Sequence, residues 1–392
     1  MPIPIKAMKQ TAAMAKAIAN SGAVATKLTD MERLYGGPEC GSLAQEYLLS
    51  SNILPLGTAI ELFGSEGTCK STLAAHLMDR FILSAGGNVH YIENETKSCA
   101  PLVRSVLSEG SEDRLDIIRA TTQEESQTVM TTVAKEVLAL THGKRRDSDP
   151  HLVGLVIDSY RVASEGTRDR NLADGHATKQ FAQEALLWRG YLPSFMGLML
   201  YSPIVFMAIN HMVEKEAAGG YGKVKDSGGG ATLKFYATYR ILLDCIKTVE
   251  QKTAAYKDLT LRTMKNSNGP VGHKIHVRVN FRGPDIPVGK TVVDWAFSDA
   301  KLLTGPDIRR DELKKQGICN TKESTKAGLY SDDVLGLSCV PIEEITTAIY
   351  SDASRLAAFR ALHDIKVFKT LDELWDAGWF FGSRTVGKDG EE

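Results

Sequence analysis

The sequence is poor in the features that mark metal, disulfide and membrane proteins. Its six cysteines are scattered, and no two of them form a CxxC pair, which argues against a zinc site and against a disulfide framework. No run of 18 apolar residues occurs, and the first residues lack the apolar centre of a signal peptide. We therefore expect a soluble chain in a reducing, cytoplasmic compartment, with no membrane partner.

An excess of charge of one sign is also lacking. Lys and Arg together number 47 and Asp and Glu 48, so the formal net charge is −1. This balance neither requires nor excludes nucleic acid, because binding depends on a local basic patch. The hydrophobic share of 43% and the charged share of 24% are those of a globular protein. A length of 392 residues allows one large core with smaller attachments.

From Leu54 onward, short apolar runs alternate with longer amphipathic segments. This alternation predicts the fold class, an α/β core with a mostly parallel, doubly wound sheet flanked by helices. The expected strands are nearly continuous apolar runs, as in parallel sheets that are buried on both faces. They are Ala59–Phe63, Val89–Ile92, Leu115–Arg119, Leu152–Ile157, Ile204–Ile209 and Ala237–Leu243. The expected helices include Ser71–Ser84, Gln123–Leu140 and His176–Trp188.

Shifts in composition divide the chain into three regions. Residues 1–35 are expected to form an N-terminal helix and linker, residues 36–290 the core, and residues 291–392 a small C-terminal domain. Within the core, the alternating runs Leu259–Met264 and Lys274–Phe281 predict an antiparallel hairpin that extends the sheet. The C-terminal domain is expected to consist of short helices and turns and to end in an acidic tip.

A glycine-rich loop, Gly64–Thr72, directly follows an apolar strand and precedes an amphipathic helix. In this context, backbone N–H groups of the loop and of the helix N-terminus can surround phosphate oxygens. Lys70 would reach the β- and γ-phosphates, and the Ser71 hydroxyl would bind Mg²⁺. ATP and Mg²⁺ are therefore the expected cofactors, and the alternative is a glycine-rich turn with a chance lysine. The residues expected to bind the nucleotide are Gly64, Ser65, Glu66, Gly67, Thr68, Cys69, Lys70, Ser71, Thr72 and Asp158.

Cys69 stands where P-loops usually carry the glycine that precedes the lysine. A β-carbon is tolerable at this position if the residue takes a right-handed helical conformation, because only a positive φ angle strictly favours glycine. Under this interpretation Gly67 would supply the local freedom that the loop needs.

Two further expected strands end in acids. Asp158 follows Leu152–Ile157, at the kind of strand end where P-loop ATPases hold Mg²⁺, so Ser71 and Asp158 are the expected metal residues. Glu95 follows Val89–Ile92, and a glutamate there can orient and polarise the water that attacks the γ-phosphate. The alternative for Glu95 is a solvated acid that only caps the strand.

The P-loop and the two acidic strand ends, in their order along the chain, resemble segments of RecA-type recombinases. The resemblance includes Leu54–Gly57 before the P-loop and the acidic strand ends at Glu95 and Asp158. Its most distinctive part is Gly228–Arg240, with the sequence GGGATLKFYATYR, which resembles the segment that closes the second DNA-binding loop in this family. The resemblance spans roughly residues 40–285. It implies a RecA-like P-loop ATPase core, with Glu95 as the catalytic base.

Three positions depart from the pattern of the family. Phe206–His211 resembles the strand that ends in the γ-phosphate sensor, where the family usually has glutamine and this chain has His211. Lys265 resembles the first of two lysines that a neighbouring subunit sends to the ATP phosphates, and Ser267 stands where the second is expected. The replacement of the P-loop glycine by Cys69 resembles the UvsX-like recombinases of bacteriophages, which also replace this glycine. The catalytic residues implied are Glu95, Lys70, His211 and Lys265. The alternative for His211 is a histidine with a purely structural role, and the alternative for Lys265 is a lysine on an exposed turn.

The resemblance also implies two DNA-binding segments, Glu165–Lys179 and Met212–Gly230. Both combine glycine with basic residues, and the second contains one aromatic side chain, Tyr221, that can stack between bases. The alternative is an ordinary surface loop of a small-molecule ATPase. The expected DNA-binding residues are Arg168, Arg170, Lys179, Lys215, Tyr221, Lys223, Lys225, Gly229, Gly230 and Lys234.

The resemblance implies an ATP-dependent recombination protein that forms filaments on single-stranded DNA and pairs it with a homologous duplex. The expected enzyme activity is DNA-dependent hydrolysis of ATP. Its partners would be single- and double-stranded DNA, further copies of the chain through the N-terminal helix, and mediator and single-strand-binding proteins. Two alternatives are a hexameric motor or helicase with the same fold, and a filament-forming DNA-binding protein with an impaired ATPase.

Overall fold

The computed structural model describes residues 36–95, 99–142, 152–161, 181–200, 202–216, 223–306 and 308–376. The N-terminal helix expected within residues 1–35 and the acidic tip of the chain lie outside these ranges. So do four of the expected DNA-binding residues, Arg168, Arg170, Lys179 and Tyr221. Within the described ranges, no helix has the length and apolar character to cross a membrane.

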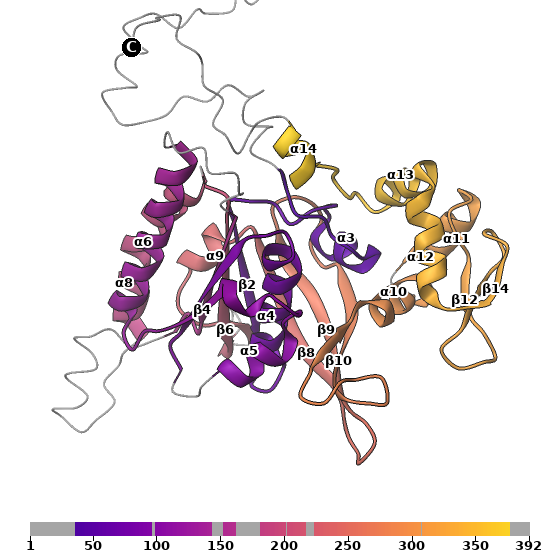
Figure 1. Ribbon diagram of the computed structural model, residues 1–392, viewed down its shortest axis with the longest axis horizontal. Helices are drawn as coiled ribbons and strands as arrows, with labels where there is room; N and C mark the ends of the chain where they lie inside the picture. The colour runs from indigo at the N-terminus through magenta and orange to yellow at the C-terminus, as the bar shows by residue number, and fades with distance from the viewer. Residues whose placement is uncertain are drawn as a thin grey trace, which may run out of the picture.

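A 10-stranded sheet forms the centre of the described structure (Figure 1). Its parallel part has the order β4-β3-β5-β6-β2-β8. These strands are β2 (Thr58–Gly64), β3 (Asn88–Glu93), β4 (Leu115–Arg119), β5 (Val153–Asp158), β6 (Ile204–Glu216) and β8 (Tyr239–Glu250). All six expected strands occur, and β6 and β8 continue several residues further. The predicted fold class, an α/β core with a mostly parallel sheet between helices, is confirmed.

Alternate residues of the central strands face two separate cores. In β6, Val205 and Met207 belong to one core, and Phe206 and Ala208 to the other. Because strand side chains alternate between the two faces, such apolar runs need helices on both sides. The first side carries α4 (Lys70–Met78), which continues as a π-helical turn (Asp79–Leu83), and α5 (Ala100–Val106). The second carries α6 (Gln123–His142) and α8 (Phe181–Met199).

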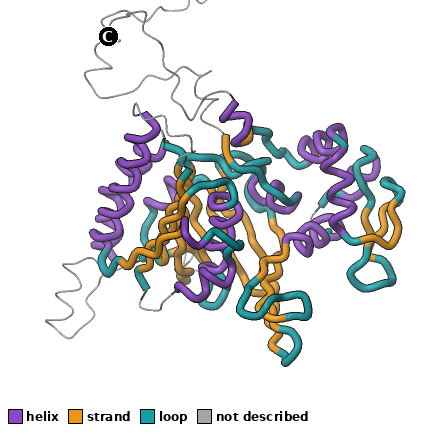
Figure 2. Tube along the Cα trace, viewed as in Figure 1, coloured by secondary structure: helices purple, strands orange, loops and turns teal. Residues whose placement is uncertain are grey.

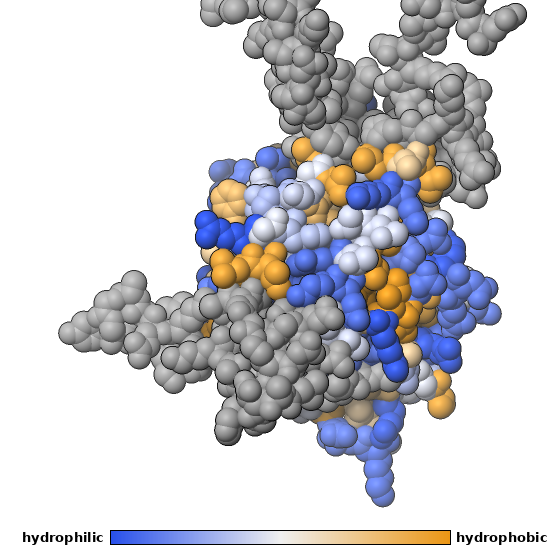
Figure 3. Space-filling model, turned by 90° about the vertical axis from the view of Figure 1, so that its left-hand side faces the viewer, coloured by the Kyte–Doolittle hydropathy of each residue, from blue (hydrophilic) through white to orange (hydrophobic). Residues whose placement is uncertain are grey.

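The figures show these two layers directly. In Figure 1, α6 and α8 lie together on one side of the sheet, and α4 and α5 lie on the other. Figure 3 looks onto the side that carries α6 and α8, where apolar areas interrupt a largely hydrophilic surface. The sheet is therefore covered on both faces, and its carboxyl edge is where a site can open.

The predicted antiparallel hairpin is present as β9 (Ala255–Asn266) and β10 (Lys274–Arg282). β9 also pairs with β8, whose last residues run beyond its parallel neighbour β2. β8, β9 and β10 thus extend the sheet as an antiparallel ribbon, which Figure 2 shows as long strands leaving the core. The edge strand β11 (Val292–Asp294) pairs with β10 and completes this part.

The chain after β11 contains more strand than we expected. Its helices are α10 (Trp295–Thr304), α11 (Arg310–Lys315), α12 (Ile342–Ser351), α13 (Ala353–Leu362) and α14 (Leu371–Asp376). A three-stranded sheet of β12 (Thr321–Glu323), β13 (Tyr330–Asp332) and β14 (Leu337–Val340) lies between α11 and α12. Each of these strands has only three or four residues, too few for a periodic apolar pattern to indicate it.

The last described residues return to the beginning of the core. β15 (Lys369–Thr370) pairs in parallel with β1 (Gly36–Gly37). The guanidinium of Arg360 donates two hydrogen bonds, of 2.8 and 2.7 Å, to the carboxylate of Glu46 in α3 (Leu43–Leu49). Glu46 is only 1% exposed, and a buried carboxylate needs such a partner. The segment that leads into the P-loop strand is therefore held in place from the C-terminal region.

Candidate nucleotide-binding site

The sheet brings the expected nucleotide-site residues to one edge. The parallel register aligns Glu93 with Asp158, Asp158 with Ile209, and Gly64 with His211. Ligands of open α/β sheets bind at the carboxyl ends of such strands. The start of the P-loop, the expected metal acid and the expected sensor histidine therefore lie side by side, although they are far apart in sequence.

The loop between β2 and α4 has the form of a P-loop. Lys70 begins α4 and is 7% exposed, and its ammonium donates hydrogen bonds to the carbonyl oxygens of Gly64 (3.1 Å) and Ser65 (2.7 Å). The Thr68 hydroxyl also donates to the Ser65 carbonyl, at 2.8 Å. Burial lowers the pKa of Lys70, and the nearby charges of Asp158 and other acids oppose that shift. The ammonium of Lys70 is thus held by carbonyl oxygens of its own loop.

Two residues of the loop need unusual backbone freedom or space. A β-carbon on Gly64 would lie 2.3 Å from the carbonyl oxygen of Leu243 in β8, so this position requires glycine. Gly67 has φ of 75°, in the left-handed region.

Cys69 does not have the right-handed conformation that we considered for it. Its φ and ψ angles are 58° and 29°, in the left-handed region that favours glycine. The reason is local, because the chain must turn from the loop into the first residue of α4, and the position is the one where P-loops carry glycine. The β-carbon of Cys69 is therefore accommodated at the cost of backbone strain, about 1–2 kcal/mol.

The conformation of Cys69 makes a testable prediction. Cys69→Val should lower the free energy of unfolding by about 1–3 kcal/mol, because a β-branched residue is strongly disfavoured at positive φ. Cys69→Gly should stay within about 1 kcal/mol of the wild type, because the relief of strain is offset by the larger entropy of the unfolded chain. Urea unfolding followed by circular dichroism measures both.

The matched control for this prediction is Cys245→Val, because Cys245 lies in strand β8 and is exposed. Valine suits a strand, so this variant should be close to the wild type in stability. An equal effect of valine at both positions would contradict the left-handed conformation of Cys69.

Ser71 and Asp158 form the part of the site that fits a divalent cation. The Ser71 hydroxyl donates to Oδ2 of Asp158 at 2.6 Å, and the Tyr91 hydroxyl donates to the same oxygen at 2.7 Å. Burial raises the pKa of Asp158, whereas the two hydroxyl donors lower it. One hydroxyl and one carboxylate beside a phosphate loop suit Mg²⁺, which binds few protein oxygens and takes its other ligands from phosphate and water.

Glu95 and His211 face each other across the same edge. Oε1 of Glu95 lies 2.9 Å from Nε2 of His211, and each side chain is 40% exposed. The other acid at the end of β3, Glu93, is 3% exposed and accepts hydrogen bonds from the Cys99 amide and from Arg119 (3.3 Å). The carboxylate of Glu93 is therefore held by protein donors, whereas the carboxylate of Glu95 is exposed enough to contact a ligand.

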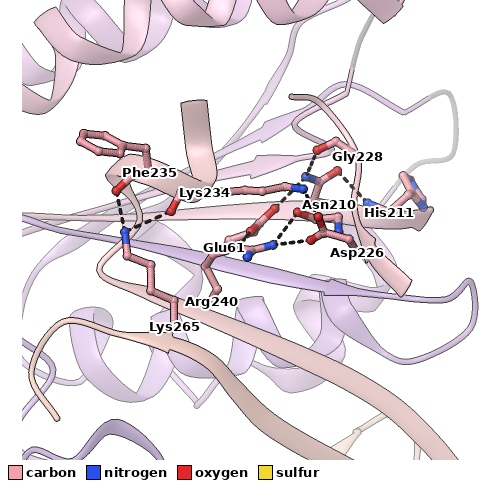
Figure 4. Close-up of polar contacts among 10 residues, drawn as sticks. Glu61, Asn210, His211, Asp226, Gly228, Lys234, Phe235, Arg240 and Lys265 are labelled. Carbon is pink, nitrogen blue, oxygen red and sulfur yellow. Dashed lines mark hydrogen bonds and ion pairs between the residues drawn. The ribbon is translucent and has the colours of Figure 1, made fainter. Parts of the chain in front are cut away.

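Behind His211 lies a buried polar cluster, drawn in Figure 4, that we did not expect. The amide of Asn210 donates to Oε1 of Glu61 at 2.8 Å and to the Gly228 carbonyl at 3.0 Å. Arg240 donates to Oε2 of Glu61 at 2.6 Å, and Glu61 is fully buried. The sequence did contain a signal, because a glutamate within the apolar strand β2 must have a partner in the core.

The cluster continues to Asp226 and Lys234. Arg240 donates to Asp226 at 2.9 Å, and the ammonium of Lys234 is ion-paired with the same carboxylate. Partial burial acts to raise the pKa of Asp226, but the hydrogen bonds from Lys234 and Arg240 lower it to about 2. Lys234, which we expected at the DNA, thus lies in this cluster and is 16% exposed.

Lys265 lies close to the same cluster and not at the P-loop of its own chain. Its ammonium donates to the carbonyls of Lys234 (3.0 Å) and Phe235 (2.5 Å), within the short helix α9 (Thr232–Tyr236). A lysine in this position stabilises a helix C-terminus. Its expected contact with the nucleotide of a neighbouring subunit stays a prediction.

The second expected DNA-binding loop is partly a hairpin. Residues 212–216 at the end of β6 pair with β7 (Lys223–Ser227) in antiparallel register. The two flanks contain neither glycine nor proline, so they can pair as strands, whereas the six glycines of this segment lie between and after them. Gly229 and Gly230 follow β7 with φ of 78° and 84°. The side chains of Lys215, Lys223 and Lys225 lie outside the described part of the structure.

The site and the fold define a RecA-like P-loop core, and comparison with known proteins agrees. The RecA protein of Campylobacter fetus is 24% identical over 293 residues, which are 74% of this chain and 75% of that protein. RecA of Helicobacter acinonychis is 23% identical over 336 residues, covering 78% and 87%. RecA of Lactiplantibacillus pentosus is 25% identical over 304 residues, covering 76% and 68%. No family model matches the chain. These relatives support a RecA-like family at the level of distant similarity.

Proposed function

We propose that this chain is an ATP-dependent recombination protein of the RecA type, which assembles as a filament on single-stranded DNA and pairs it with a homologous duplex. The observation that carries the proposal is the meeting of the P-loop, the Ser71–Asp158 pair and the Glu95–His211 pair at one sheet edge. Such groups can bind a nucleoside triphosphate, hold a divalent cation and activate water. The similarity to RecA proteins supports the recombination part of the proposal.

The P-loop lysine would exchange its partners when ATP binds. Lys70 would release the carbonyls of Gly64 and Ser65 and donate to the β- and γ-phosphates, which are stronger acceptors. Ser71 and Asp158 would hold Mg²⁺, and the ion would supply positive charge against the phosphates. The backbone N–H groups of the loop would surround the remaining phosphate oxygens.

Glu95 would act as the general base in hydrolysis. It lies beside the metal acid at the same sheet edge, and one of its carboxylate oxygens is hydrogen-bonded to His211. The second oxygen would accept the proton of the attacking water. His211 would hold the carboxylate in place and would be the residue of β6 that is closest to the γ-phosphate.

Strand β6 would couple the nucleotide site to the DNA-binding segments. His211 lies on β6, and the same strand continues into the hairpin with β7. We propose that the segments Glu165–Lys179 and Met212–Gly230 contact the DNA backbone through nine of the ten expected DNA-binding residues. The tenth, Lys234, is ion-paired with Asp226 in the buried cluster. Bases would stack on Tyr221, and base pairing rather than side chains would read the sequence.

Exposed apolar side chains support self-assembly. Phe235 is 75% exposed and Leu186 is 61% exposed, and both line a hollow between α8 and α9 together with Pro193 and Tyr236. Apolar surface of this kind indicates a contact surface. We propose that a second copy of the chain covers it in a filament, with the N-terminal helix and Lys265 as further contacts. Mediator and single-strand-binding proteins would be transient partners.

The test of the proposal is ATP hydrolysis with and without single-stranded DNA. We expect turnover that DNA stimulates, and a fall of at least about 100-fold in Lys70→Ala, because the main positive charge on the phosphates is lost. Lys252→Ala, on the exposed turn between β8 and β9, is the matched control and should hydrolyse ATP like the wild type.

Other outcomes of the same experiment would separate the alternatives. Turnover that ignores DNA would contradict the assignment of the DNA-binding segments. A closed ring in electron microscopy would favour a hexameric motor. Nucleotide binding without turnover would favour a filament-forming DNA-binding protein with an impaired ATPase, and Cys69, His211 and Ser267 are the positions that support this second candidate. Cys69 is also the feature that supports a relationship to the phage UvsX-like recombinases.

A further inference from the structure

A lysine from outside the P-loop binds the P-loop. Lys257, on strand β9, donates a hydrogen bond from its ammonium to the carbonyl oxygen of Gly67 at 2.7 Å. The backbone of Lys257 is held on both sides, because it pairs with Thr248 of β8 and with Val279 of β10. Nothing in the P-loop motif points to this residue, since 190 positions separate it from Gly67.

The contact acts on one peptide unit of the loop. In a planar trans peptide the C=O and N–H bonds point in opposite directions. Because the ammonium of Lys257 holds the Gly67 carbonyl, the N–H of Thr68, which belongs to the same peptide unit, points away from Lys257. Phosphate-binding loops use N–H groups of this kind to surround phosphate oxygens.

The loop also needs support from outside, because its backbone is strained. Cys69 takes a left-handed conformation two residues after Gly67. A residue stays in such a conformation only when the structure around it prevents relaxation. Lys257 also interacts electrostatically with Cys69. Burial raises the pKa of the Cys69 thiol, and the positive charge of Lys257 opposes that shift.

We infer that Lys257 is a positioning residue of the nucleotide site, which orients the Gly67–Thr68 peptide toward the phosphates and adds a positive charge from the same chain. The inference rests on the proposed function, because it takes the polyphosphate of a nucleoside triphosphate as the ligand of this loop. Lys257 belongs to the same chain as the loop, so its effect does not require a filament. It should therefore be visible in nucleotide binding without DNA.

The experiment is titration of the full-length chain with ADP and with a non-hydrolysable ATP analogue, in the absence of DNA. Lys257→Met should weaken binding about tenfold or more, because a hydrogen bond from a charged donor is lost. Lys257→Arg should restore most of the affinity. With saturating ATP and DNA, kcat of Lys257→Met should stay within about threefold of the wild type, because Lys257 contacts the carbonyl of Gly67 and its effect is expected in nucleotide binding.

The matched control is Lys252→Met, which removes a lysine from the exposed turn that precedes β9 and should leave the affinity unchanged. The unfolding midpoint of each variant shows whether a change in affinity reflects loss of fold. Equal affinity of the wild type and Lys257→Met would overturn the inference and leave the proposed function standing. A folded wild-type chain that binds neither nucleotide would instead overturn the proposed function, and with it this inference.

Discussion

Replacing Arg240 with methionine is expected to lower the free energy of unfolding by about 3–5 kcal/mol. Arg240 is the cation that faces Glu61 in the buried cluster, and the side chain of Glu61 is 0% exposed. Removing the guanidinium would leave a carboxylate in the core that keeps only the amide of Asn210 as a donor among the hydrogen bonds described above. Urea unfolding measures the loss.

The double variant Glu61→Gln/Arg240→Met should recover part of the lost stability. A neutral amide in place of the carboxylate carries no unpaired charge, and its oxygen can still accept from Asn210. The recovered free energy would measure the cost of the unpaired buried charge. The loss that remains would measure the lost packing of the Arg240 side chain, which the double variant does not restore.

The matched control for this prediction is Arg355→Met. Arg355 is ion-paired with Asp352 at 3.2 Å, but the two side chains are 33% and 42% exposed. A solvent-exposed pair contributes no more than about 1 kcal/mol, so the loss should be small. Equal losses in Arg240→Met and Arg355→Met would show that the buried cluster does not stabilise the core.

The second large effect is expected for Glu95→Gln, which should reduce the rate of ATP hydrolysis by about 10²–10⁴-fold. The amide cannot accept a proton from the attacking water, although its oxygen can still accept a hydrogen bond from His211. Nucleotide affinity should change little, because the expected phosphate ligands are on the P-loop and the expected Mg²⁺ ligands are Ser71 and Asp158. Single-turnover hydrolysis together with nucleotide titration measures the two quantities separately.

Glu93→Gln is the control for the second prediction. Glu93 ends the same strand, but its carboxylate is bound by the Cys99 amide and by Arg119. We expect the free energy of unfolding to fall, while the rate of hydrolysis per folded molecule stays within a few-fold of the wild type. The reverse pattern, with normal turnover in Glu95→Gln, would rule out Glu95 as the base.

The parallel core could be predicted because its signals are local. The expected strands are short, largely apolar runs of four to seven residues, and turns and amphipathic stretches separate most of them. The strand β4 was predicted with the bounds that it has, Leu115–Arg119. The short strands β12 to β14 were missed, because three or four residues carry no usable periodicity.

The residues at the carboxyl edge could also be foreseen, and for a topological reason. Parallel strands of one sheet end on the same side, so a P-loop after β2 and acids after β3 and β5 must approach one another. The Ser71–Asp158 contact of 2.6 Å follows this rule. The facing of Glu95 and His211 depends on side-chain directions, and the sequence alone contains no information of that kind.

The sequence by itself therefore determined the fold class, the P-loop and the set of strand ends from which a nucleotide site is built. These depend on local periodicity and on the rule that parallel strands share an edge. Only the tertiary structure decided that Cys69 is left-handed, that Lys234 and Lys265 lie at the buried cluster around Arg240, and that Lys257 holds the P-loop. The conformation of Cys69 follows from the local turn into α4. The contacts of Lys234, Lys265 and Lys257 join residues brought together by strand order and register, so their partners are set by the whole sheet and not by neighbours in the chain.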